Sequence, residues 1–117
     1  MKYETRYIAS LGIDIEFKLG KNAADNFDII ESSQTNDIWF HIDDHSSCHV
    51  IASIPDDTNF NKKQLLYIIK QGAILCKQHS KYKSQQNVSI IYTYIKNVTM
   101  TNIIGSVITE NTKTIKI

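Results

Sequence analysis

The first twenty residues alternate between apolar and polar side chains in the way of half-buried β-strands. Positions 13, 15, 17 and 19 are apolar and positions 14, 16 and 18 are charged, a period-two pattern that places one face of a strand in a core. Residues 3–9 are also rich in strand-forming types, and a short connection around Gly12 follows them. These two stretches predict a β-hairpin. The apolar stretches 37–42 and 48–54, which the polar residues 43–47 separate, predict a second one.

A short amphipathic helix is predicted from about residue 23 to residue 32. Asn22 stands where a helix cap is expected, and Asp25 lies near the positive end of the helix. The spacing favours one apolar face made of Ala23, Phe27 and Ile30.

A longer helix is predicted from about residue 62 to residue 79. Apolar residues between Leu65 and Cys76 form a broad stripe opposite several lysines, and Asn61 or Asn59 would cap the helix. Gly72 costs such a helix stability, and a glycine at this kind of position indicates close approach to a neighbouring element.

The last third of the chain returns to strand-forming patterns. Residues 88–94, 98–101, 106–110 and 112–117 read as strands, with turns at 102–105 and at Asn111. The predicted fold is therefore α+β, a single domain over residues 1–117, with a mainly antiparallel sheet on which one long and one short helix pack.

Composition adds few constraints on the class of protein. The chain has 117 residues, is 42% hydrophobic and 21% charged, and has one proline and four glycines, as expected of an ordinary folded domain. It has no apolar run long enough to span a membrane and no secretory signal pattern, so we expect an intracellular, cytoplasmic protein. Cys48 and Cys76 lack the count and spacing of a disulfide framework and are expected to be reduced thiols.

Charge is distributed unevenly along the sequence although the net charge is only +1. Residues 1–60 contain four basic and eleven acidic side chains, whereas residues 61–117 contain nine lysines and the single acid Glu110. Such asymmetry is what a chain needs to present a basic face to a polyanion while it stays near neutrality overall. Complementary surfaces within one fold would explain it equally well.

Three histidines, a cysteine and two aspartates occur within residues 41–49. These residue types could hold zinc, but the spacing argues against it: if His41 and His49 face each other on paired strands, Cys48 points to the opposite face and His45 lies at the turn. No metal and no cofactor are therefore expected.

Catalysis is also poorly supported by the sequence. The chain has no nucleophile elbow and no phosphate-binding glycine loop, and its cysteines lie in apolar stretches. Asp43 and Asp44 could form an acid/base pair, but aspartates in exposed turns are far more common. Trp39 is expected more often in a core than as a stacking platform. We predict that the protein is not an enzyme.

The run Asp37-Ile38-Trp39-Phe40-His41, with Asp43-Asp44 and Ser46-Ser47-Cys48-His49-Val50 after it, closely resembles the signature of the NFACT-R domain, the RNA-binding module of ribosome quality-control factors. Supporting similarities are the Gly20-Lys21-Asn22 segment, the end of the long helix and the C-terminal strands. The chain looks most similar to the short standalone members, which are coiled-coil-domain-containing proteins. His45-Ser46 replaces the proline-glycine of the long factors, and Thr99 and Thr101 stand where lysine is frequent.

The resemblance implies a non-enzymatic nucleic-acid-binding module, with RNA (tRNA or ribosomal RNA) as the first expectation and DNA as the second. Trp39, His41, Ser47 and His49 would shape or line the pocket, next to Asn22. Phosphates would be contacted by five lysines: Lys21, Lys77, Lys81, Lys83 and Lys96. A protein–protein adaptor that docks on the ribosome or on another protein is the alternative, and a metal-dependent enzyme is the weakest reading.

Overall fold

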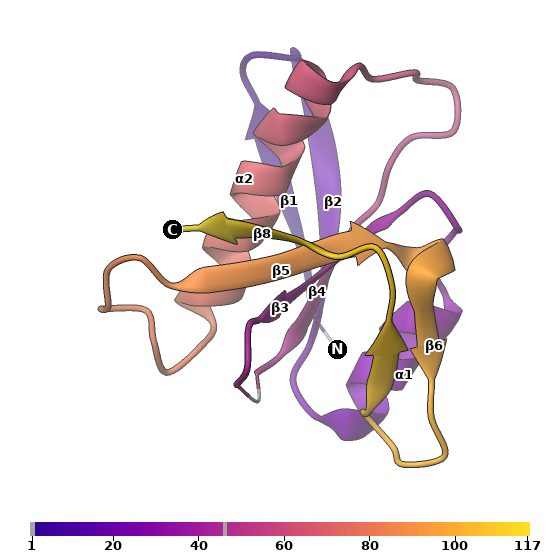
Figure 1. Cartoon of the computed structure of the whole chain (residues 1–117). Coiled ribbons are helices and arrows are strands. Elements are labelled where there is room, and N and C mark those ends of the chain that lie inside the picture. The colour runs from indigo at the N-terminus through magenta and orange to yellow at the C-terminus, as the bar shows by residue number, and fades with distance from the viewer. Residues whose placement is uncertain (1, 46) are drawn as a thin grey trace.

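A six-stranded antiparallel sheet forms the centre of the protein (Figure 1). The computed structural model describes residues 2–45 and 47–117. The strands are β1 (Lys2–Ile8), β2 (Ile13–Gly20), β3 (Ile38–Ile42), β4 (His49–Ala52), β5 (Ser89–Tyr94) and β8 (Lys113–Lys116), in the spatial order β1-β2-β4-β3-β5-β8. A separate two-stranded hairpin consists of β6 (Val98–Met100) and β7 (Val107–Thr109), and a 3-10 turn (Ile95–Asn97) precedes it.

Two helices complete the fold, α1 (Ala23–Glu31) and α2 (Lys62–Gln78). Asn22 caps α1 by accepting a hydrogen bond from the backbone N–H of Asp25, and Asn61 caps α2 in a capping box with Gln64. The predicted α+β class, the mainly antiparallel sheet and the long and short helices are confirmed. No helix in the described part of the chain is long and apolar enough to cross a bilayer.

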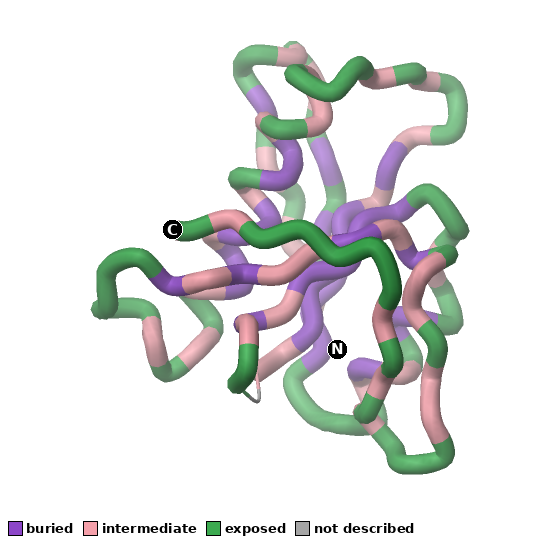
Figure 2. Tube along the Cα trace, in the orientation of Figure 1, coloured by how far each residue is buried: buried purple, intermediate pink, exposed green. Residues whose placement is uncertain are grey.

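The side of the sheet that α2 covers is apolar and tightly packed. The core on this side joins residues of the sheet to residues of α2, and all of them are fully buried. They are Phe17, Phe40, Val50 and Ile90 of the sheet and Ile68, Ala73 and Leu75 of α2. A Cβ added at Gly72 would overlap the ring of Phe40, which confirms that this glycine marks close approach. The buried residues gather toward the centre of the molecule in Figure 2, along the middle strands of the sheet and on the inner face of α2.

The opposite side carries α1 and a smaller apolar cluster. Ile29 and Ile30 of α1 pack against Trp39 of β3 and Ile51 of β4, together with Ile95. The predicted apolar face of α1 is wrong in part: Ala23 is exposed and Phe27 only half-buried, whereas the polar Asn26 is buried. A nine-residue helix covers only part of this side, so polar side chains of the sheet remain next to it.

The β6–β7 hairpin reaches back to the start of α1. Gly105 at its tip has a φ of +85°, and a Cβ placed there would lie 2.7 Å from the Cβ of Ala23. Ile103 and Ile104, also at the tip, are 68% and 64% exposed. Glycine is therefore required for this turn to reach α1, and the contact fixes the position of the two isoleucines.

Candidate nucleic-acid interface

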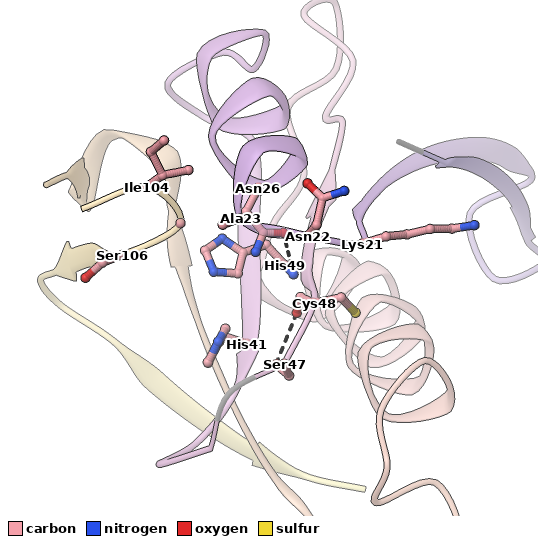
Figure 3. A pocket seen from close by; sticks show the side chains of 11 residues that line it. Lys21, Asn22, Ala23, Asn26, His41, Ser47, Cys48, His49, Ile104 and Ser106 are labelled. Carbon is pink, nitrogen blue, oxygen red and sulfur yellow. Dashed lines mark hydrogen bonds between the residues drawn. The ribbon is translucent and has the colours of Figure 1, made fainter. Parts of the chain in front are cut away.

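A cavity of about 540 Å³ opens on the α1 side, at the end of the sheet where β3 ends and β4 begins (Figure 3). Its walls are the first turn of α1, the β3–β4 loop and the tip of the β6–β7 hairpin. Among the residues singled out from the sequence, the cavity brings together Lys21, Asn22, His41, Ser47 and His49. The lysines of the C-terminal half do not line it.

Trp39 lies beneath the cavity rather than in it. The side chain is 2% exposed, its ring stacks on the ring of His41 with 5.6 Å between centroids, and its indole N–H donates to Nδ1 of His49 at 3.1 Å. Trp39 therefore orients both histidines from below. It has no exposed face on which a base could stack.

His41 and His49 face each other across the ends of the two strands, as expected if they lie on paired strands. Their ring centroids are 5.0 Å apart and the rings are nearly perpendicular. His49 Nδ1 accepts from Trp39, so its proton is on Nε2; His41 Nδ1 lies 2.7 Å from the carbonyl oxygen of Ile42, which can only accept, so the lone pair of His41 is on Nε2. The pair thus presents one donor and one acceptor.

Burial keeps both imidazoles neutral. It lowers the pKa of His49 to about 3, and the neighbouring His41 adds to the effect. Burial also lowers the pKa of His41, against the opposing influence of the Ile42 carbonyl and the Asp43 carboxylate. Neutral imidazoles can form hydrogen bonds with the neutral polar groups of a ligand but do not attract a phosphate by charge. That attraction has to come from other residues.

Asn26 is a part of the site that sequence reasoning missed. Its Oδ1 accepts from the backbone N–H of His49 at 3.2 Å, which ties the first turn of α1 to the start of β4. A Cβ at Gly20 would overlap this oxygen, so the glycine next to Lys21 is what lets α1 approach the sheet. The available signal was a polar residue one turn before Ile30, on the side of the helix that faces the core.

Ile104 is the second residue that was missed. It was placed in the turn at 102–105, where polar residues are usual, and it forms the apolar wall of the cavity. Two consecutive isoleucines inside a turn were the signal, since exposed apolar residues at a loop tip require an explanation.

Cations near the cavity come from the N-terminal half of the chain. Lys21 lies on its rim, with the ammonium group pointing outward in Figure 3. At the end of α2, burial lowers the pKa of His79, the charges of Lys2, Lys21 and Arg6 add to this shift, and the carboxylate of Glu4 opposes it. Arg6 is paired with Glu4 at 2.9 Å. The acidic half of the sequence therefore supplies basic groups at this edge.

The four remaining lysines singled out from the sequence are in three different environments. Lys81 and Lys83 are exposed on the loop after α2, and Tyr82 between them contacts His45 of the β3–β4 loop, with 4.7 Å between ring centroids. Lys77 donates to the carbonyl oxygen of Ile117 at 3.0 Å. Lys96 lies over the ring of Tyr94, at the opposite end of β3 from the cavity.

Both cysteines are free thiols. Cys76 belongs to α2, and Cys48 lines the cavity but directs its Sγ toward the carbonyl oxygen of His79 at the end of α2. A hydrogen bond between the thiols lowers the pKa of Cys48, and the same bond together with burial raises the pKa of Cys76. Cys48 precedes β4 instead of lying in it, and it points away from His49, as the alternation of strand residues predicted. Over residues 2–45 and 47–117, no group of three histidine, cysteine or acidic side chains is placed to hold a metal ion.

A model of the NFACT protein RNA binding domain matches residues 14–116. The chain belongs to this family. The resemblance carried by residues 37–50 is confirmed, and the family description supports an RNA-binding role for this NFACT-R domain.

Two individual comparisons agree with the assignment. Coiled-coil domain-containing protein 25 of Danio rerio is 35% identical over 88 residues, which cover 71% of this chain and 40% of that relative. The structure of the C-terminal part of the fibronectin/fibrinogen-binding protein of Streptococcus suis superposes with a TM-score of 0.77 at 22% identity, over 97% of this chain and 44% of that one. The second likeness shows the fold. The chain spans less than half the length of either protein.

Proposed function

We propose that the NFACT-R chain is a non-enzymatic module that binds RNA of the translation apparatus, tRNA or ribosomal RNA, as part of ribosome-associated quality control in the cytoplasm. The observation that carries the proposal is the cavity built from the family signature: His41, Ser47 and His49 converge on it, and Trp39 supports them. Polar groups that converge on a concave site with a cationic rim are what recognition of a nucleic acid requires.

Phosphate contacts are assigned to Lys21, Lys81 and Lys83. All three are exposed. Lys21 lines the cavity, and Lys81 and Lys83 flank Tyr82, which contacts His45 of the β3–β4 loop that supplies Ser47 to the cavity. The ammonium group of Lys77 donates to the carbonyl oxygen of Ile117, and Lys96 is at the far end of β3 from the cavity. Both lysines should therefore contribute less to phosphate binding than the sequence suggested. Asn22, the cap of α1, lines the cavity, and the N-terminal end of a helix favours an anion.

The test is binding of the purified chain to tRNA, single-stranded RNA and duplex DNA at two salt concentrations. Changing Lys21, Lys81 and Lys83 together to glutamate should abolish salt-sensitive binding, because each lost phosphate contact removes about 0.7 from the slope of log K against log salt on single strands. The matched control changes Lys62, Lys63 and Lys70 of α2 to glutamate, since these three exposed lysines alter the net charge equally at a distance from the cavity.

Equal losses in the two triple variants would mean that net charge alone, and no defined site, drives the binding. No binding of the unchanged protein to any of the three ligands would remove the RNA proposal and favour the protein-adaptor alternative. Tighter binding to duplex DNA than to tRNA would make DNA the ligand class.

A further inference from the structure

Two buried side chains of the cavity keep hydrogen-bond donors that no residue in the described part of the chain uses. Asn26 is 7% exposed, and with Oδ1 engaged by the backbone of His49 its Nδ2 amide has no partner. His49 is 3% exposed, and with Nδ1 engaged by Trp39 its Nε2–H has none. Every fully enclosed side-chain nitrogen and oxygen of the described residues is satisfied, so these two donors open onto the cavity. Each donor belongs to a side chain that is more than nine-tenths buried but turns this one polar atom toward the cavity, which points to a ligand that accepts from it.

An acceptor lies beside the two donors. Nε2 of His41 carries a lone pair, and the ring of His41 contacts the ring of His49, whose backbone is bonded to Asn26. Figure 3 shows the three side chains following one another along one wall, with His49 in the middle. The wall therefore presents an acceptor, a donor and a donor, in that order.

The β6–β7 hairpin contributes one large apolar side chain, Ile104, to the lining, together with Gly105 and Ser106. Ile104 faces the cavity although it is 64% exposed, and the contact of Gly105 with Ala23 holds it there. An exposed isoleucine that lines the same cavity as these hydrogen-bonding groups is suited to cover the face of a flat ring whose edge meets those groups. Lys21 lies on the rim, and its outward-pointing ammonium group is available to a phosphate on the sugar that carries the ring.

The volume of the cavity sets the size of the ligand. About 540 Å³ lies within the range of roughly 300–1,000 Å³ of small-molecule sites, enough for one nucleotide and too small for a base pair with its backbones. Resting on the proposed RNA-binding function, we propose that the cavity holds one unpaired cytidine of the bound RNA, with its base edge on His41, His49 and Asn26 and its face on Ile104.

Cytosine follows from the order of groups on the wall. Its Watson–Crick edge presents the N4 amine as donor and then N3 and O2 as acceptors, which complements an acceptor followed by two donors. Uracil presents a donor at N3, where the wall has the Nε2–H of His49, and guanine presents two donors to two donors. Adenine matches two of the three groups and leaves the amide of Asn26 unpaired.

The experiment measures binding of short single-stranded oligouridines in which one central nucleotide is replaced by cytidine, adenosine or guanosine, by fluorescence anisotropy. The cytidine oligonucleotide should bind about tenfold more tightly than the all-uridine one, the scale at which one well-paired base edge discriminates. Annealing a complementary strand over the cytidine should remove the preference, because a paired edge is no longer available.

The variant Ile104→Ala should reduce the preference for cytidine several-fold, and Ile108→Ala is its matched control. Ile108 lies in β7 of the same hairpin, is 62% exposed and does not line the cavity. Both residues are on the surface, so neither change threatens the fold.

Failure of this inference can be distinguished from failure of the proposed function. Salt-sensitive binding of tRNA with equal affinity for the four oligonucleotides, a preference for another base, or equal behaviour of the two isoleucine variants would overturn the cytidine site and leave RNA binding intact. No binding of tRNA or of any oligonucleotide would overturn both.

Discussion

The two sides of the sheet differ in how completely a helix covers them. The α2 side has a seventeen-residue helix, about 25 Å long, whose closest contact is the glycine-to-ring approach of Gly72 and Phe40. The α1 side has a nine-residue helix, about half that length, and beyond its first turn lie His41, His49 and the open cavity. One strand serves both sides, since Phe40 of β3 points to α2 while Trp39 and His41 point to α1.

The α2 side therefore accounts for the stability of the fold, and the α1 side for what the protein binds. On the α2 side, apolar area is removed from water and no polar group has to be satisfied, so the side supplies free energy of folding. On the α1 side, the buried polar residues Asn26 and His49 are held by directional hydrogen bonds that leave selected atoms facing the cavity. Changes on the first side should therefore alter the stability of the fold, whereas changes on the second should alter what the protein binds and how it responds to pH.

The largest effect is expected from Gly72→Ala on the α2 side. Alanine normally stabilises a helix, but here the added methyl group would overlap the buried ring of Phe40, and overpacking should lower the free energy of unfolding by about 3 kcal/mol. Urea denaturation measures it. The control is Gly12→Ala, where the Cβ meets no atom within 4 Å and only the positive φ of 67° is penalised, by about 1 kcal/mol. Equal losses at the two glycines would contradict the tight packing on this side.

The next effect concerns the pH dependence that the α1 side gives to stability. The pKa of His49 falls from an ordinary 6.5 to about 3 on folding, so the unfolded chain binds the proton first as pH decreases. The stabilisation that comes from keeping His49 neutral is fully present above about pH 6.5 and is lost progressively as the pH falls toward 3. Between pH 7 and pH 5 the loss from this group should be about 2 kcal/mol.

The measurement is urea denaturation at pH 7 and at pH 5 for the unchanged protein and for His49→Asn. Asparagine can still accept from the Trp39 indole but does not titrate, so the variant should lose about 2 kcal/mol less than the parent over the same interval. His41, whose pKa burial also lowers, and the carboxylates remain in both proteins, so their contributions cancel. A parallel decline in the two proteins would mean that His49 is not held neutral by burial.

The sequence predicted the strands and helices of the two sides better than the site on the α1 side. Period-two and helical spacing located the strands and helices and both asparagine caps, because these depend on neighbours in the chain. The glycine inside the helix indicated a close approach at Gly72, but its partner Phe40 is distant in the sequence and came only from the structure. The partnership of Asn26 with His49 spans 23 residues, and the wall formed by Ile104 depends on a hairpin that returns to α1, so no local pattern contained them. The uneven charge along the sequence does not show where cations lie in space: Lys2 begins β1, Lys21 follows β2, and the charges of both act on His79 at the end of α2.

The smallest effect compares the caps of the two helices. Asn22→Ala and Asn61→Ala each remove a side chain that accepts a backbone N–H at 2.9 Å, and each should lower the free energy of unfolding by about 1 kcal/mol. Only Asn22 lines the cavity, so only its variant should also weaken binding of RNA at a salt concentration where both proteins are fully folded. Because the two changes are chemically identical and cost similar stability, loosening of the fold cannot account for a difference in affinity. Equal affinities would show that the cap of α1 supports the helix and takes no part in the interface.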